Sequence, residues 1–193
     1  EEGAKVLGEF LRRLLKQDKN IILVSASSGG PIVAETLATQ GIADNNRLRG
    51  WLNICGVLHG SPVIDSLLFW PGTLIMRTIA LFEGWSYRSL VSLSRARSVP
   101  RFAKFSPPPQ MTIVNYIGTP FSAQISQYGG LFKTVLKRKG PNDGLTYITD
   151  ALAPGHTILG IGSDHFVMED PLIEEKTRAL LPVLLQLMNK HQP

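Results

Sequence analysis

The sequence predicts an α/β protein with a mostly parallel sheet and helices on both faces of that sheet. Four short apolar runs typical of buried strands occur at residues 20–24, 51–58, 111–117 and 156–161. Amphipathic stretches that predict helices occur at residues 2–17, 31–40 and 171–190. The run at 51–58 is apolar almost throughout, as expected for a strand that is buried on both faces. Strands that alternate with helices in this way form parallel sheets, because each crossover helix returns the chain to the same edge.

Composition fits one globular domain over residues 1–193, large enough to bury a sizeable core. The net charge of +5 would suit an anionic partner such as a membrane surface or nucleic acid. The two basic clusters, at 95–104 and 133–139, carry no nucleic-acid motif, so we interpret them as solvated surface and expect no nucleic-acid partner. No signal peptide is visible, and the compartment stays open.

The single cysteine, Cys55, excludes an internal disulfide and zinc sites built from several cysteines. It falls inside the predicted strand 51–58, where we expect a buried, inert thiol. No H-E-x-x-H motif, paired histidines or acidic cluster is present, so we predict neither a metal site nor a cofactor.

The N-terminal helix, 2–17, is predicted to pack its apolar face on the core. The apolar positions of that face are Val6, Leu7, Phe10, Leu11, Leu14 and Leu15. Residues 118–140 are interpreted as a surface insertion with a helix at 130–138.

Residues 62–105, called the cap segment below, are very apolar and are interrupted at Pro71-Gly72. The longest uncharged run, 66–76, is too short to cross a bilayer. We interpret the segment as a mobile cap over an apolar cleft, with a helical hairpin of the core as the alternative. Leu68 and Trp70 are its candidate substrate-binding residues, and the cap could make transient contact with a membrane surface.

Ser27 stands between the strand 20–24 and a helix that begins near Pro31, in the pattern Ser25-x-Ser27-x-Gly29. This strand–turn–helix arrangement is a G-x-S-x-G elbow with serine in its first small position. Small residues at both flanking positions are expected because a side chain there would collide with the strained turn. The elbow exposes the serine hydroxyl at the sheet edge, facing the positive end of the helix.

Ser27, Asp143 and His165 follow one another along the chain, each in a predicted loop beyond the carboxyl end of a strand. Attack on an ester carbonyl needs a hydroxyl, a base that takes its proton, and an acid that orients the base. We therefore assign Ser27 as nucleophile, His165 as base and Asp143 as acid. Asp150 and Asp164 are lesser candidates for the acid.

Three stretches resemble the α/β-hydrolase lipases and esterases. They are SASSGGPIVAETLA at the elbow, WLNICGVLHGSPVIDSL after it, and PNDGLTYITDALAPGHTILGIGSDHFV around Asp143 and His165. The resemblance implies the α/β-hydrolase fold and an ester or lipid substrate. His59 is a further candidate substrate-binding residue, which could shape the pocket entrance. The chain departs from the family at Ser25, in the insertion 118–140, and in the cap segment, which matches no segment of the family.

The resemblance also implies an oxyanion hole with the backbone N–H of Ser28 as one donor. In this fold the second donor comes from a loop after an earlier strand, whereas only one helix precedes Ser27 here. We expect the early strands upstream, in a longer protein; a catalytically crippled chain is the alternative. The sequence thus predicts a serine hydrolase of carboxylic esters. An acyltransferase with the same triad and a non-catalytic lipid- or protein-binding module are the rival functions.

Overall fold

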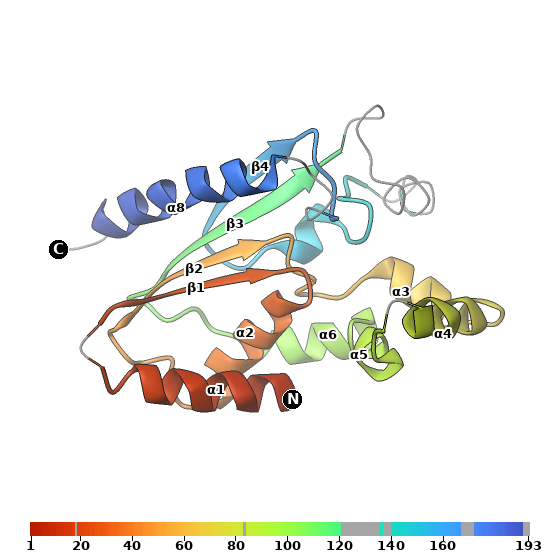
Figure 1. Cartoon of the computed structure of the whole chain (residues 1–193), viewed down its shortest axis with the longest axis horizontal. Helices are drawn as coiled ribbons and strands as arrows, with labels where there is room; N and C mark the ends of the chain where they lie inside the picture. The colour runs from red at the N-terminus through yellow and green to blue at the C-terminus, as the bar shows by residue number, and fades with distance from the viewer. Residues whose placement is uncertain (18, 83, 121–135, 137–139, 167–171, 191–193) are drawn as a thin grey trace.

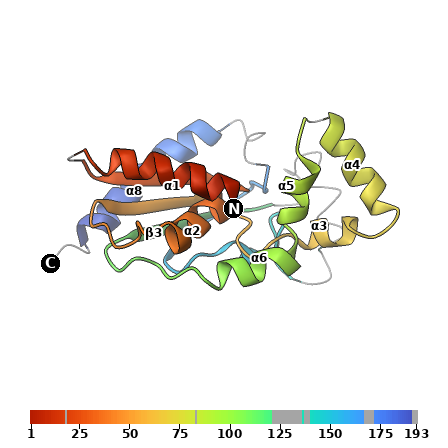
Figure 2. The same cartoon turned by 90° about the horizontal axis from the view of Figure 1, so that it is seen from below.

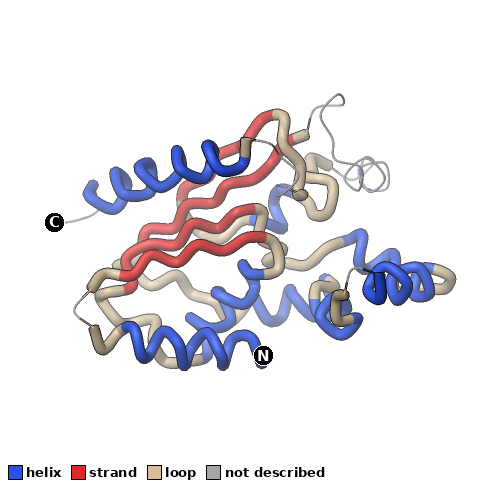
Figure 3. Tube along the Cα trace, viewed as in Figure 1, coloured by secondary structure: helices blue, strands red, loops and turns tan. Residues whose placement is uncertain are grey.

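One parallel sheet of four strands forms the centre of the described chain (Figures 1 and 3). The computed structural model describes residues 1–17, 19–82, 84–120, 136, 140–166 and 172–190. The strands are β1 (Ile21–Ala26), β2 (Leu48–Ile54), β3 (Thr112–Thr119) and β4 (His156–Ile161), and they lie side by side in that order.

Helices cover both faces of the sheet. On one face lie α1 (Glu2–Leu14), α2 (Gly29–Thr39) and α6 (Arg95–Phe102), and on the other lies α8 (Ile173–Lys190) (Figure 1). This arrangement confirms the predicted α/β class with helices on both faces of a parallel sheet.

The alternation of side chains along β2 and β3 explains why both faces are buried. Trp51 and Ile113 belong to the core cluster under α1 and α2. Leu52 and Val114, the next residue in each strand, belong to the cluster under α8. Each central strand therefore contributes apolar side chains to two cores, as its near-continuous apolar sequence predicts.

The N-terminal helix packs through a narrower face than its apolar periodicity predicts. Ala4, Gly8 and Leu11 are its buried residues. Val6 and Phe10 are 63% and 56% exposed, so their placement on the core-facing side was wrong. Ala4 and Gly8 are small and let α1 lie close to α2, Leu11 enters the core, and Leu7, Leu14 and Leu15 pack partly buried against the same cluster.

The predicted strand 51–58 ends earlier in the structure. Cys55 lies one residue beyond β2, in a backbone conformation with a φ of 46°, and this turn ends the strand four residues earlier than expected. The helix predicted at 130–138 falls outside the described residues except for Leu136.

The cap segment contains three short helices before α6, namely α3 (Pro62–Leu67), α4 (Gly72–Phe82) and α5 (Tyr87–Ser92). They lie beyond the carboxyl ends of the strands and to one side of the sheet (Figures 1 and 2). Neither of the two core clusters of the described residues includes a residue of these helices. Among the described helices, none has the length and hydropathy that crossing a membrane requires.

Candidate active site

Ser27 occupies the tight turn between β1 and α2. Its φ of 49° is a left-handed conformation that a non-glycine residue adopts at a cost, as at a nucleophile elbow. The turn is fastened to the end of β2: the Ser27 N–H donates to Ile54 O (2.9 Å), and the Val57 N–H donates to Ser27 O (3.2 Å). These bonds hold the strained turn against the end of β2.

The two glycines that follow Ser28, Gly29 and Gly30, differ in the space around them. A Cβ on Gly30 would lie 2.8 Å from Asn53 Oδ1 and 3.0 Å from Gly56 Cα, so glycine is required there. A Cβ on Gly29 would meet only Ser25 Cβ, at an ordinary 3.4 Å. A single Cβ is therefore accommodated at position 29, whereas Gly30 is the position that needs glycine; the expectation that larger side chains are excluded at position 29 stays a prediction.

Ser25, which replaces the first glycine of the motif, has a structural explanation. It is buried, and its Oγ accepts a hydrogen bond from the Trp51 indole N–H at 2.8 Å. The indole N–H of a buried tryptophan must find an acceptor, and a glycine at position 25 would leave it without this one.

Ser27, His165 and Asp143 form a hydrogen-bonded relay. Ser27 Oγ lies 2.8 Å from His165 Nε2, and His165 Nδ1 lies 2.8 Å from Asp143 Oδ2. A carboxylate oxygen only accepts hydrogen bonds, so Nδ1 carries a proton and its N–H donates a hydrogen bond to Asp143 Oδ2. Nε2 is then the acceptor for the Ser27 hydroxyl, which is the tautomer that a general base needs.

The Asp143 side chain is fixed by its own loop. Its Oδ1 accepts the N–H groups of Leu145 (2.9 Å) and Thr146 (2.8 Å), which leaves Oδ2 for His165. Gly144 has a φ of 98°, and this conformation lets the chain fold back over the carboxylate. Asp143 is fully buried, so both of its oxygens find their partners within the protein.

His165 follows β4 and is held beside the same loop, because its N–H donates to Asp143 O at 2.6 Å. The loop before it crosses β3 at Gly118. A Cβ on Gly118 would lie 2.6 Å from Asp164 O and 2.9 Å from Ser163 O. The absence of a side chain at Gly118 therefore permits the approach that places the His165 ring, which is itself buried.

The other two candidate acids lie in different surroundings. Asp164 accepts the N–H of Phe166 at 2.9 Å. Asp150 faces Arg95, whose Nε lies 3.3 Å from Asp150 Oδ2, an ion pair without hydrogen-bond geometry. Burial raises the pKa of the Asp150 carboxyl, and the charges of Arg95 and His59 offset part of that increase.

Among the described residues, the predicted substrate-binding residues His59, Leu68 and Trp70 form no hydrogen bond with the relay. The His59 ring packs edge-on against Phe102, and its Nδ1 lies 3.2 Å from Asp150 O. Leu68 is half-buried at the end of α3, and Trp70 is 84% exposed. Their contact with a substrate stays a prediction.

The backbone N–H of Ser28 has no hydrogen-bond partner within the described residues. Ser28 is the N-cap of α2 and is exposed, so this N–H and the positive end of the helix are available beside Ser27. A helix N-terminus stabilises negative charge, which is what an oxyanion donor must do.

Cys55 is buried close to the relay. Burial first, and the negative charge of Asp143 second, raise the pKa of its thiol far above the ordinary range. Its Sγ accepts the Gly118 N–H at 3.4 Å. The thiol is therefore protonated at neutral pH and adds no charge beside Asp143.

Thr146, Gly60 and Ser61 support the Asp143 loop and were missed in the sequence. The Thr146 hydroxyl donates to Gly60 O at 2.9 Å, and the Ser61 hydroxyl donates to Leu145 O at 2.6 Å. The resemblance included Thr146 and Ser61 within matching stretches, yet no spacing rule pairs residues so far apart in the chain.

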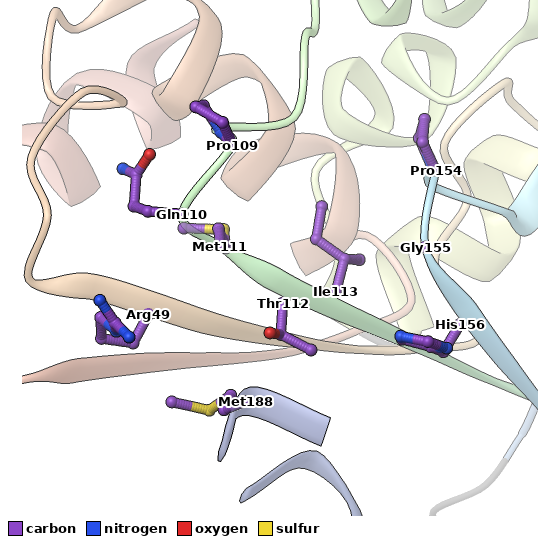
Figure 4. Close-up of a pocket in the computed structure, with 10 residues that line it drawn as sticks. All are labelled: Arg49, Pro109, Gln110, Met111, Thr112, Ile113, Pro154, Gly155, His156 and Met188. Carbon is purple, nitrogen blue, oxygen red and sulfur yellow. The ribbon is translucent and has the colours of Figure 1, made fainter. Parts of the chain in front are cut away.

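A pocket of about 680 Å³ lies elsewhere, at the amino ends of the strands (Figure 4). Its lining includes Arg49 at the start of β2, Thr112 at the start of β3 and His156 at the start of β4. Because the strands are parallel and Ser27 follows the carboxyl end of β1, this pocket is at the opposite end of the sheet from the relay. No cluster of metal-ligating side chains occurs in the described part of the chain.

Comparison with known proteins adds fold-level information. Neither a model of a protein family nor a curated protein sequence matches the chain. A metagenomic carboxyl esterase superposes with a TM-score of 0.64 and 23% identity over 83% of this chain and 50% of the esterase. The mature lipase of Bacillus licheniformis gives a TM-score of 0.69 and 21% identity over 96% of this chain and 73% of the lipase.

The lipase of Staphylococcus hyicus is also similar, with a TM-score of 0.58 and 14% identity over 88% of this chain and 70% of that lipase. This chain thus spans half the length of the metagenomic esterase and about three quarters of the Bacillus lipase. Identities this low speak for the fold alone. The chain has the α/β-hydrolase-like fold of these lipases and esterases.

Proposed function

We propose that this chain is a serine hydrolase that cleaves carboxylic esters through an acyl-enzyme. The observation that carries the proposal is the relay from Ser27 through His165 to Asp143, with Ser27 in a left-handed turn. A serine hydroxyl, an imidazole and a carboxylate meet at hydrogen-bond distance in the order that nucleophilic catalysis requires.

The reaction begins when Ser27 Oγ attacks the ester carbonyl carbon and its proton passes to His165 Nε2. Asp143 Oδ2 accepts the Nδ1–H and stabilises the imidazolium that forms. The Ser28 N–H donates to the developing oxyanion. The tetrahedral intermediate then re-forms its carbonyl as the bond between the acyl carbon and the alcohol oxygen breaks, and His165 gives its proton to the departing alcohol. The acyl group stays on Ser27 Oγ.

Water resolves the acyl-enzyme by the same steps in reverse. His165 takes a proton from the water as its oxygen attacks the acyl carbon, and the tetrahedral intermediate again meets the Ser28 N–H. The intermediate releases the carboxylic acid, while the proton on His165 returns to Ser27 Oγ.

The cap segment suggests an acyl-lipid as the substrate. Phe69, Trp70, Leu81 and Phe82 are between 75% and 84% exposed, and they are the four most exposed large apolar side chains of the described residues. Arg77 and Arg88, both exposed, lie on the helices among them. Apolar side chains beside cations match the chemistry of an anionic lipid surface.

Labelling with a fluorophosphonate probe tests the hydrolase proposal. We expect the wild-type chain to be labelled, Ser27→Ala to be unlabelled, and Ser106→Ala, an exposed serine before β3, to be labelled as fast as the wild type. Absence of labelling in the wild type would contradict the proposal and favour a non-catalytic hydrolase-like module.

Vesicle flotation tests the lipid surface separately, with the Ser27→Ala protein so that no turnover occurs. We expect binding to vesicles of phosphatidylcholine with phosphatidylglycerol and weaker binding to phosphatidylcholine alone. Phe82→Ala should weaken binding, whereas Phe10→Ala, the same change at an exposed position of α1, should not. Equal effects of the two changes would contradict a role for the cap segment.

A further inference from the structure

The loop that carries Asp143 is attached to the chain just before the cap segment. Three hydrogen bonds make the attachment: Thr146 Oγ1 to Gly60 O (2.9 Å), Ser61 Oγ to Leu145 O (2.6 Å) and His59 N to Asp150 O (2.9 Å). The two segments are more than eighty residues apart in sequence. The position of the candidate acid therefore depends on a segment outside its own loop.

Thr146 and Leu145 both contact the two sides of this attachment, and of the two it is Thr146 that does so through its side chain. Its N–H donates to Asp143 Oδ1 at 2.8 Å, and its carbonyl accepts the Asp143 N–H at 3.1 Å. Its hydroxyl meanwhile holds Gly60. Thr146 is fully buried, so no water competes for these bonds.

Gly60 is a firm anchor for that hydroxyl. Its φ is 88°, and a Cβ there would lie 2.7 Å from the backbone N of Arg95. The backbone at the start of α6, late in the cap segment, therefore packs directly on Gly60. The next residue, Ser61, donates its N–H to Leu93 O at 2.9 Å. The Arg95 N–H donates to Asp65 Oδ1 at 2.9 Å, which closes the start and the end of the cap segment on each other.

We propose that Thr146 is a positioning residue for the Asp143 carboxylate, because its hydroxyl anchors the acid loop on Gly60 at the base of the cap segment. The proposal rests on the proposed hydrolase function for its kinetic consequence. Catalysis depends on the placement of the acid to a fraction of an ångström, and one anchored hydroxyl can supply that constraint.

Thr146→Val tests the proposal, because valine keeps the shape of threonine and removes the hydroxyl. We expect fluorophosphonate labelling to slow about tenfold, the kinetic equivalent of one buried hydrogen bond. With p-nitrophenyl butyrate, kcat should fall while KM stays unchanged, and Thr146→Ser, which restores the hydroxyl, should recover most of the rate. Should Thr146→Val fail to fold, Thr146→Ala removes the same hydroxyl with less bulk.

Thr36→Val is the matched control. Thr36 is also fully buried, and its hydroxyl donates to Ile32 O at 2.7 Å within α2, so the variant loses a comparable bond at a site without contact to Asp143. We expect it to lower the melting temperature without slowing the labelling. Equal slowing in Thr36→Val and Thr146→Val would overturn the proposal.

A second measurement does not depend on activity. The proton of His165 Nδ1, held 2.8 Å from Asp143 Oδ2, should give a far-downfield NMR resonance that Asp143→Asn abolishes. Thr146→Val should shift or broaden this resonance, and Thr36→Val should not. An unlabelled wild type would reject the hydrolase proposal, and the NMR comparison would then decide the role of Thr146. An unchanged resonance in Thr146→Val would overturn the proposal that Thr146 positions Asp143.

Discussion

The relay and the helices α3 to α5 lie at the same end of the sheet and are built in opposite ways. Asp143 and His165 are buried, and the hydrogen-bonding groups of the Asp143 carboxylate are paired within the protein. On α4 and its flanks, by contrast, Trp70 and Phe82 are almost fully exposed. One region pairs its polar groups internally, and the other buries Met76 of α4 but exposes several of its largest apolar side chains.

Under the proposed function, the two regions would divide the work of an ester hydrolase between them. The rate of a chemical step depends on fixed geometry, and the short bonds around Asp143 fix it before any substrate arrives. Under the same proposal, contact with a lipid depends on apolar surface that is free to be buried, and the exposed side chains of the cap segment would supply that surface. Changes in the relay should therefore alter the rate on every ester, and changes in the cap segment should alter the choice among esters.

Asp143→Asn is expected to have the largest effect, a loss of about 10³–10⁴-fold in kcat. An asparagine NH₂ group facing His165 Nδ1 would favour the tautomer in which Nε2 carries the proton and cannot accept from Ser27. Steady-state kinetics with p-nitrophenyl butyrate measure the loss, and Asp44→Asn, at an exposed loop position, is the control. A larger loss in Asp150→Asn or Asp164→Asn would assign the acid to that residue.

Gly118→Ala is expected to lower kcat about a hundredfold, because a displacement near 1 Å in the site can cost that much. The added Cβ would meet the backbone oxygens of Ser163 and Asp164 and would push the His165 loop away from Ser27. Gly3→Ala is the control, since the atoms nearest its Cβ would belong to the Ile32 side chain, with Cδ1 at 3.2 Å, and not to any backbone. An unimpaired Gly118→Ala enzyme would mean that the loop before His165 adapts freely.

The double variant Trp70→Ser and Phe82→Ser tests the other side of the comparison. We expect its activity on an emulsified long-chain ester to fall about tenfold, as two large apolar side chains lose contact with lipid, and its activity on a soluble short-chain ester to fall far less. The control is Val6→Ser with Phe10→Ser on α1, which should leave both activities unchanged. Equal losses of activity on the two esters would show that the cap segment does not determine substrate selectivity.

The sequence predicted the parts of the fold that depend on local patterns. The apolar run before Ser27 and the small residues after it indicated the turn between β1 and α2. The strand 156–161 was predicted at the bounds it has, because turn-forming residues flank it on both sides. Order along the chain was also enough to name Ser27, Asp143 and His165, which the structure brings together.

Features that depend on distant contacts could not be predicted. Apolar periodicity marks a helix face, but it does not say how wide the neighbouring surface is, and so Val6 and Phe10 were misplaced. The need for glycine at position 30 comes from Asn53 on β2 and from Gly56 just beyond its end. The bond between Thr146 and Gly60 joins two loops that no sequence motif relates.

The pKa of Asp150 also depends on residues distant in the sequence. Its substitution is expected to have the smallest effect, a change in stability with pH. Burial raises the pKa of its carboxyl more than Arg95 and His59 lower it, so the folded chain holds this proton more tightly than the unfolded chain. The free energy of unfolding therefore loses a contribution as pH rises from the ordinary pKa of the carboxyl through its raised value. Asp150→Asn removes that titration.

We expect the melting temperature of Asp150→Asn, relative to the wild type, to be higher at pH 7 than at pH 3.5 by on the order of 1–4 °C. Thermal melts at the two pH values measure this, with Asp44→Asn as a control whose difference should be the same at both. A constant difference for Asp150→Asn would mean that the Arg95 ion pair fully offsets the burial of the carboxylate. Labelling of Asp150→Asn should persist, because the carboxylate that orients His165 belongs to Asp143 and stays in place.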